Sequence, residues 1–324
     1  MFYGWWIVVV AMMSMAMSAG LFLHGFGFYF EPMRTQFGWS RGVMSGAYSL
    51  SRFESGFLGP VEGYLIQRFG SRMVMAVGFV SFGLGFLLLS RVNSIFSFYL
   101  AFLMLSLGSS FGGWSPITAS INNWFRRHRT KAIGSAMLGL GLGGVALSPV
   151  VAYLIDNYGW ENTALLSGVI VVVVGIPLSR LVRFSPEPYG YLPDGDFYRP
   201  QVRGSPGLPQ LTPNDRKPVS EAEYDFTVKE ALKSSAFWVM SIGHAVALLS
   251  ISALGLHLVA YLQAELDFST GEAAKVVMVL TGFNMVGQPL GGVLGDRYPK
   301  KYIAFFTLVG HCIGLLLLAT ADSF

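Results

Sequence analysis

Long apolar runs dominate this chain and restrict it to one kind of fold. Nine of them are long enough to cross the roughly 30 Å hydrocarbon layer of a bilayer as helices, and they lie at about 5–30, 42–66, 73–90, 95–125, 132–155, 163–182, 237–263, 271–295 and 302–320. Hydrophobic residues make up 53% of the 324 residues and charged residues 12%, which leaves too little polar surface for a soluble protein of this size. The sequence therefore predicts an all-α polytopic membrane protein.

The basic residues gather in alternate loops. If the N-terminus is cytoplasmic, the inner loops hold Arg68, Arg72, Arg126, Arg127, Arg129, Lys131, the residues at 180–233, Arg297, Lys300 and Lys301. This bias follows the positive-inside rule, so we expect a multi-pass protein of the plasma membrane, or of the inner membrane of a bacterium, with a cytoplasmic N-terminus. Because the basic residues are dispersed and not interleaved with aromatic residues in one patch, nucleic acid is not an expected partner.

A ten-residue pattern occurs twice, each time between two apolar runs. GYLIQRFGSR occupies 63–72 and GVLGDRYPKK occupies 292–301. Both resemble the signature loop of the major facilitator superfamily, and the duplication implies two related halves with a transport site between them. The resemblance implies that the following residues form the gate: Gly63, Gln67, Arg68, Gly70, Arg72, Gly292, Asp296 and Arg297.

A proline-rich segment separates six predicted spans from three. Eight prolines lie between about 183 and 233 among mixed charges, which is typical of a linker. We expect a six-helix N-terminal bundle at 1–182, a cytoplasmic linker at 183–232 and three helices of a C-terminal bundle at 233–324. Superfamily members usually have six helices in each half, so the resemblance implies three more helices beyond Phe324 and an open flank on the second half.

Other motifs resemble one branch of the superfamily. YGWW at 3–6, FYFEPM at 28–33 and NWFRRHR at 123–129 are similar to segments of the monocarboxylate porters and oxalate/formate antiporters. This resemblance implies a small organic anion as substrate, with protons or a counter-anion as the coupling partner.

Four positions depart from the resembled patterns. Gln67 stands where the first signature loop usually has Asp, and Pro299 stands where the second usually has Gly. An Asp there can cap the adjoining half-turn and pair with the Arg of the following helix as an inner-gate latch, so we expect Gln67 to make a weaker latch than Asp296. In the eighth span, Asn284 and Gln288 replace the acidic residue and the arginine of carboxylate carriers. Neutral amides thus replace a cationic clamp, and the identity of the substrate stays open.

Charged residues at membrane depth are costly and mark candidate sites. Arg52 and Glu54 lie about ten residues, or roughly 15 Å, from the outer end of the second span and point in different directions. Arg52 is a candidate for anion binding or for structural pairing with a neighbouring helix. Glu54 is a candidate for structural pairing or for proton carriage. Glu62 is expected at the gate, paired with Arg68, Arg72 or the arginines that follow residue 125.

Two histidines lie at similar depths in the two halves. His24 stands where the resembled carriers hold a lysine exposed to the outer cavity, and His257 is its rough counterpart in the repeat. Because histidine takes up a proton near physiological pH, both are proton-coupling candidates together with Glu54, and His24 is also a substrate-binding candidate. The alternative for either is a hydrogen-bonded packing role. Phe28 and Tyr29 are candidates for lining the cavity.

Glycines are frequent in the second and fifth spans, where they permit close helix contact. We expect a packing role for Gly56, Gly59, Gly63, Gly134, Gly139, Gly141, Gly143 and Gly144.

The leading hypothesis is a secondary transporter of a small organic anion, a mono- or dicarboxylate, that works by alternating access with proton symport or anion exchange. An exporter of amphipathic compounds on the same fold, and a non-transporting membrane sensor, are the alternatives. The sequence lacks a G-x-x-x-x-G-K-[ST] loop and an H-E-x-x-H motif, so we expect no ATP drive, catalysis, cofactor or metal ion. The expected partners are the organic anion, its coupling ion and the lipid bilayer, with the protein as a monomer.

Overall fold

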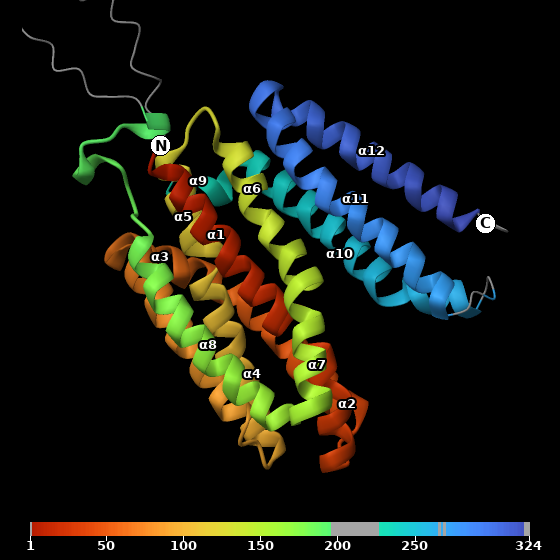
Figure 1. Ribbon diagram of the computed structural model, residues 1–324. Helices are drawn as coiled ribbons and strands as arrows, with labels where there is room; N and C mark the ends of the chain where they lie inside the picture. Colours follow the sequence, from red (N-terminus) through yellow and green to blue (C-terminus); the bar gives the residue numbers. More distant parts are fainter. Residues whose placement is uncertain (1, 196–226, 265–266, 268–269, 321–324) are drawn as a thin grey trace, which may run out of the picture. The chain divides into compact units, whose positions relative to one another are not determined.

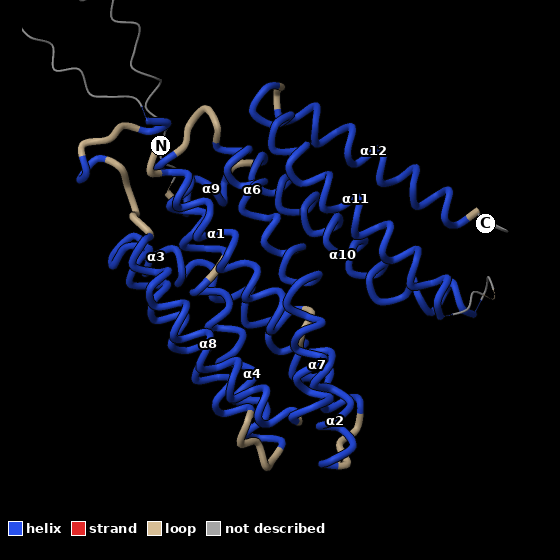
Figure 2. The backbone as a smooth tube through the Cα atoms, in the orientation of Figure 1, coloured by secondary structure: helices blue, strands red, loops and turns tan. Residues whose placement is uncertain are grey.

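The computed structural model describes residues 2–195, 227–264, 267 and 270–320, and every regular element in these residues is helical (Figures 1 and 2). The membrane-length elements are built from α1 (Gly4–Ser18), η1 (Ala19–Leu23), α2 (Phe26–Phe37), α3 (Arg41–Leu89), α4 (Ile95–Gly112), α5 (Trp114–Trp124), α6 (Arg129–Leu142), η2 (Gly143–Leu147), α7 (Ser148–Tyr158), α8 (Trp160–Leu181), α10 (Ser235–Ala264), α11 (Thr270–Arg297) and α12 (Lys300–Ala319). Three short helices complete the set: η3 (Glu187–Tyr189), η4 (Pro193–Gly195) and α9 (Val228–Lys233).

Each of the nine predicted spans falls on helix, which confirms the all-α fold class. Six helical stretches in the described part of the chain are long and apolar enough to cross a membrane: Gly4–Phe30, Arg41–Leu89, Ile95–Trp124, Arg129–Tyr158, Trp160–Leu181 and Lys300–Leu318. The second of these contains two predicted spans, and α10 contributes a shorter apolar helix at Ser235–Ile251.

The contacts divide the chain into two compact units. The first comprises Met1–Tyr198 together with Thr281–Ile303, and the second comprises Arg199–Leu280 together with Ala304–Phe324. The first unit therefore holds α1 to α8 and the C-terminal part of α11. The domain boundaries expected from the sequence stay a prediction.

The long helix α3 is a hairpin of two spans. Gly70, with φ of 78° and ψ of 156°, interrupts it in a region of backbone conformation that favours glycine. The limb before Gly70 runs parallel to α4, because the Tyr99 hydroxyl donates to the Val43 carbonyl at 2.9 Å and the Ser106 hydroxyl donates to the Ser51 carbonyl at 3.4 Å.

The limb after Gly70 runs antiparallel to the same helix. A Cβ on Gly78 would lie 2.5 Å from the carbonyl carbon of Phe111, and one on Gly85 would lie 2.8 Å from the backbone nitrogen of Leu105. Both limbs of α3 therefore pack against α4 and run in opposite directions, as two successive spans must.

A second close contact joins α1 to α6. A Cβ on Gly139 would overlap the Met12 carbonyl oxygen and lie 2.8 Å from its carbonyl carbon, and a Cβ on Gly143 would lie 2.9 Å from the Gly20 nitrogen. Figure 1 shows α1 beside α6. The predicted packing role is met at these two glycines. It is not met at Gly56, Gly59 and Gly63, where an added Cβ would have no neighbour within 4 Å among the described atoms.

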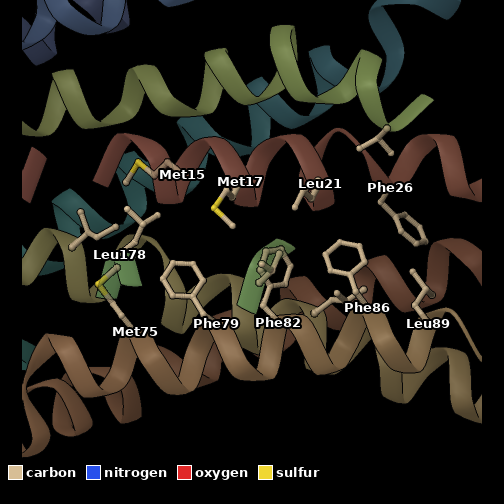
Figure 3. Packing of buried hydrophobic residues seen from close by; sticks show 14 of the residues in the cluster. Met15, Met17, Leu21, Phe26, Met75, Phe79, Phe82, Phe86, Leu89 and Leu178 are labelled. Carbon is tan, nitrogen blue, oxygen red and sulfur yellow. The ribbon is translucent and has the colours of Figure 1, made fainter. Parts of the chain in front are cut away.

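Aromatic and sulfur-containing side chains fill the core of the first unit. Figure 3 shows Phe79, Phe82 and Phe86 of α3 facing Met15 and Met17 of α1. All five residues are buried. Because lipid tails are as apolar as these side chains, their contribution comes from close packing and not from removal of water.

Candidate functional site

Two π-helical turns, η1 in the first span and η2 in the fifth, contact each other at the centre of the candidate site. Such turns are rare and frequently occur at functional sites. His24 follows η1 directly, and a Cβ on Gly144 of η2 would lie 3.1 Å from the Cδ2 atom of His24. The absence of a side chain at Gly144 thus leaves room for the imidazole, which is exposed.

The same glycine-rich segment contacts α11. A Cβ on Gly134 would lie 2.8 Å from the Gln288 carbonyl oxygen, and one on Gly141 would lie 2.8 Å from Cγ of Met285. The helix formed by α6 and η2 therefore brings together two groups of predicted site residues. His24 packs at one end of it, and Met285 and the Gln288 backbone carbonyl of α11 pack along it.

The two predicted amides of α11 bind each other. Gln288 Nε2 donates to Asn284 Oδ1 at 2.9 Å, one helical turn away. The Gln288 Oε1 atom is buried and accepts no hydrogen bond from the described residues. An unsatisfied buried carbonyl oxygen is costly, so this atom is an acceptor available to a ligand donor.

Phe28 and Tyr29 point into different surroundings. Phe28 is 42% exposed, whereas Tyr29 is 0% exposed. The Tyr29 hydroxyl lies 3.5 Å from the Ser167 hydroxyl oxygen, and its ring stacks on Phe26 with centroids 6.3 Å apart. Of the two, Phe28 has the position that a cavity-lining residue needs.

The side chains of Arg52 and His257 lie outside the described residues, so their predicted roles stay predictions. Glu54 is half-buried on α3, and its Oε2 atom is buried without a hydrogen-bond partner in the part of the chain that the structure describes. No group of three His, Cys, Asp or Glu side chains in the described residues is placed to hold a metal ion.

Among the residues that the structure describes, Glu62 has no ion-pair partner of the kind expected from the sequence. It is 3% exposed, and its carboxylate accepts hydrogen bonds from the hydroxyls of Ser110, at 2.5 Å, and Ser115. Two of the arginines expected as its partners, Arg68 and Arg72, bond to other groups. Arg68 donates to the Tyr64 hydroxyl at 2.6 Å and Arg72 donates to the Arg180 carbonyl.

Asp296 of the second signature loop caps α6. Its two carboxylate oxygens accept the backbone N–H groups of Thr130, at 2.8 Å, and Lys131, at 3.0 Å. These groups belong to the first turn of the helix, where free N–H groups and the helix dipole favour an anion. Gly292 permits the approach, because a Cβ there would lie 3.0 Å from the Thr130 carbonyl oxygen.

The first signature loop differs from the second at the corresponding positions. Gln67 is exposed and Gly63 has no described neighbour within 4 Å of an added Cβ, whereas Asp296 and Gly292 contact α6. The predicted weakness of a latch at Gln67 is consistent with this difference and stays a prediction. Arg297 is exposed in the last turn of α11.

Sequence reasoning missed an ordered segment after α8, residues 183–195, which we call the strap. Asp194 Oδ2 accepts the backbone N–H groups of Arg126 at 3.1 Å and Arg127 at 2.9 Å, and Oδ1 accepts that of His128 at 3.4 Å. The Asp194 side chain is 4% exposed, with the Arg127 Nε atom 3.7 Å away. Asp194 has a φ of 62°, in the left-handed region that aspartate tolerates. Of the features of the strap, this one was the hardest to predict from the sequence.

Aromatic residues hold the other end of the strap. The Arg183 guanidinium lies 3.9 Å from the ring centroids of both Tyr3 and Tyr189, and the Trp124 indole N–H donates to the Arg183 carbonyl at 2.8 Å. Cation–π contacts and hydrogen bonds of this kind each contribute modestly. Together they fix the first thirteen residues of the expected linker to the bundle.

Asp194→Ala is expected to release the strap. It removes an acceptor of three N–H groups, each worth about 1.5–3 kcal/mol when the acceptor is charged. Trypsin cleavage after Arg183 in the detergent-solubilised protein should therefore accelerate at least about tenfold. Glu187→Ala, an exposed change within the strap, is the matched control and should cleave at the wild-type rate. Equal cleavage of the wild type and Asp194→Ala would show that the carboxylate does not anchor the strap.

Residues 4–324 match the family model described as Major Facilitator Superfamily. The chain is 27% identical over 332 residues to Monocarboxylate transporter 13 of Bos taurus, a match that covers 99% of this chain and 69% of that protein. It is 26% identical over 347 residues to Monocarboxylate transporter 2 of Mesocricetus auratus, covering 99% and 66%. It is 25% identical over 309 residues to the Oxalate:formate antiporter of Oxalobacter formigenes, covering 93% and 66%. Because the family match extends over nearly the whole sequence, this chain belongs to the major facilitator superfamily, a family of membrane transporters and not of enzymes.

Proposed function

We propose that this protein is a secondary carrier of a small organic anion, a mono- or dicarboxylate, that works by alternating access with proton symport or anion exchange. The three relatives reported above are two monocarboxylate transporters and an oxalate:formate antiporter. The observation that supports a carrier most directly is the Asp296 cap on α6. It joins the second signature loop to the fifth span through two hydrogen bonds, a contact small enough to break and reform in each cycle.

The proposed substrate contacts come from both sides of the glycine-rich segment. His24 would attract the anion, and Arg52 would supply the fixed positive charge. Asn284 and Gln288 would hydrogen bond to the substrate, with Phe28 and Tyr29 as neighbours. His24, Glu54 and His257 are the proton-coupling candidates of this proposal. His24 packs against Gly144, and Met285 packs against Gly141, on one helix. These contacts support the proximity of these groups.

The proposed orientation has the N-terminus in the cytoplasm of a plasma membrane or bacterial inner membrane. The Phe2 ring contacts the Trp124 ring, and Asp194 accepts a hydrogen bond from the turn that follows Trp124. These contacts gather the three groups at one end of the first unit. Arg126 and Arg127 lie in the same turn. The positive-inside rule assigns such an end to the cytoplasm.

Reconstitution of the purified chain in liposomes tests the carrier. Vesicles loaded with unlabelled oxalate or formate should take up radiolabelled formate and oxalate faster than empty vesicles if anions exchange. Vesicles without a counter-anion should take them up only under an inward proton gradient if protons are co-transported. Uptake in neither case, with export of an amphipathic dye instead, would favour the exporter; no flux of any probe would favour the sensor.

Gln288→Ala is expected to lower formate and oxalate uptake about tenfold. It removes the Nε2 amide group, which donates one N–H to Asn284 and carries a second N–H able to donate to a carboxylate oxygen of the substrate. A hydrogen bond to a charged ligand is worth about 1.5–3 kcal/mol. Asn157→Ala is the matched control, because Asn157 is an exposed amide that donates to the Tyr153 carbonyl of its own helix. Wild-type uptake by Gln288→Ala would remove the amide pair from the proposed binding site.

A further inference from the structure

The turn between the second and third spans carries two arginines without acidic partners. Arg68 and Arg72 are exposed, and the sequence has no aspartate or glutamate between Glu62 and Asp156. Gln67 occupies the position that the signature pattern usually fills with aspartate. Among the residues that the structure describes, neither arginine forms an ion pair. Two positive charges at this end of the spans are therefore available to an anion from outside the chain.

An apolar crevice lies beside this turn, between the two limbs of α3 and helix α4. We call it the α3 crevice, and it is lined by Leu65, Phe69, Met73, Val74, Val77 and Phe111. Three of these side chains, at positions 69, 73 and 77, are about half exposed, so the crevice opens at the surface of the first unit. Val77 lies seven residues beyond Gly70, or roughly 10 Å along the helix. The crevice thus extends from the turn into the part of the span that lies in hydrocarbon.

The Arg68 side chain is held beside the α3 crevice. Its guanidinium carbon lies 5.5 Å from the centroid of the Phe69 ring, which lines the crevice, and 5.9 Å from that of the Tyr64 ring. It donates one N–H to the Tyr64 hydroxyl at 2.6 Å. Arg72, on the other limb, donates one N–H to the Arg180 carbonyl. Because a guanidinium has five N–H donors in a planar fork that fits a phosphate group, both arginines keep donors for a phosphate.

Cations next to an apolar crevice fit an amphipathic anion better than a small one. A free phosphate or carboxylate would use the arginines and leave the crevice without a ligand. A zwitterionic lipid would fill the crevice but would bring its own positive charge close to the arginines. An anionic glycerophospholipid satisfies both parts of the surface. The proposed orientation also places this turn at the cytoplasmic leaflet, whose anionic lipids attract arginine and lysine side chains near the membrane surface.

We propose that the α3 crevice, together with Arg68 and Arg72, binds an anionic glycerophospholipid. One acyl chain lies in the crevice, and the phosphate accepts N–H groups from the two guanidinium groups. The lipid supplies the negative charge that Gln67 lacks, and it joins the two limbs of α3 at their turn. This site goes beyond the proposed function, because lipid binding here does not depend on which anion the protein carries.

Native mass spectrometry of the detergent-solubilised chain, titrated with lipid, tests the headgroup contacts. Dioleoylphosphatidylglycerol should bind at least about fivefold more tightly than dioleoylphosphatidylcholine, which has the same acyl chains. Arg68→Ala and Arg72→Ala should each weaken binding of the anionic lipid about fivefold and leave that of the zwitterionic lipid unchanged. Arg91→Ala is the matched control, because Arg91 is an exposed arginine just beyond the other end of α3.

The same measurement tests the crevice. Val77→Trp should weaken binding of dioleoylphosphatidylglycerol, because the larger side chain fills space that the acyl chain needs. Val80→Trp is its control, since Val80 is a partly exposed valine of the same limb that does not line the crevice. Glycerol 3-phosphate, which has the phosphate and no acyl chains, should not displace the bound lipid.

Four results would overturn the proposal. Equal affinity for the two lipids, or an unchanged affinity for the anionic lipid in both arginine variants, would remove the arginines from the site. Wild-type binding by Val77→Trp would place the acyl chain outside the crevice. Displacement by glycerol 3-phosphate would make the turn a site for free phosphate. Because no transport is measured, a failure of the proposed carrier function in liposomes leaves these results unaffected.

Discussion

Gly139→Leu is expected to destabilise the protein by about 3 kcal/mol or more, the upper range for overpacking. The added Cβ alone would overlap the Met12 carbonyl oxygen, which is backbone and cannot rotate away. The helices α1 and α6 would have to separate, and their packing has no hydrophobic driving force to restore it in lipid. The midpoint of unfolding in a denaturant titration of the solubilised protein measures the effect.

Gly59→Leu is the matched control for this substitution. Gly59 is also helical, in the second span, and an added Cβ would meet nothing within 4 Å in the described part of the molecule. It should unfold at or above the wild-type midpoint, because leucine is a better helix former than glycine. Equal midpoints for Gly139→Leu and Gly59→Leu would mean that α1 and α6 do not pack at the distance seen here.

Asp296→Ala is expected to open the cap on α6. The two N–H groups that the carboxylate accepts would lose their partners, a loss of about 1.5–3 kcal/mol for each charged hydrogen bond. Hydrogen exchange of the amides of Thr130 and Lys131 should therefore accelerate by a factor on the order of ten to a hundred. Mass spectrometry of a peptide that contains these two residues measures the change.

Two further variants separate charge from contact at the cap. Asp296→Asn keeps one acceptor oxygen and loses the charge, so its exchange rates should fall between those of the wild type and Asp296→Ala. Asp156→Ala removes an exposed carboxylate from α7 and is the control, which should exchange at the wild-type rate around Thr130. Unchanged exchange in Asp296→Ala would remove the main support for a latch, and with it the observation on which the proposed carrier chiefly depends.

The sequence alone determined the spans and the turn between the second and third. Length and hydrophobicity suffice for this, because a bilayer accepts only segments that satisfy their own backbone hydrogen bonds over a fixed thickness. The position of Gly70 was also readable, since the signature pattern places a glycine where the helix must reverse. The latch residue Asp296 could be named from the resemblance of its loop to the signature pattern, but its partner in the structure, the first turn of α6, was not expected.

The tertiary structure alone decided which side chains meet. Glu62 was expected beside arginines a few residues away, but the break at Gly113 places two serines of the fourth span against it. Gly139 and Gly59 look alike in sequence, and only the approach of α1 distinguishes them. Asp194 lies in a proline-rich segment whose composition predicts a linker, yet its carboxylate is held by three N–H groups from a turn some seventy residues earlier. These partners depend on the register and direction of neighbouring helices, which the hydrophobic pattern of a membrane span does not encode because most of its faces are equally apolar.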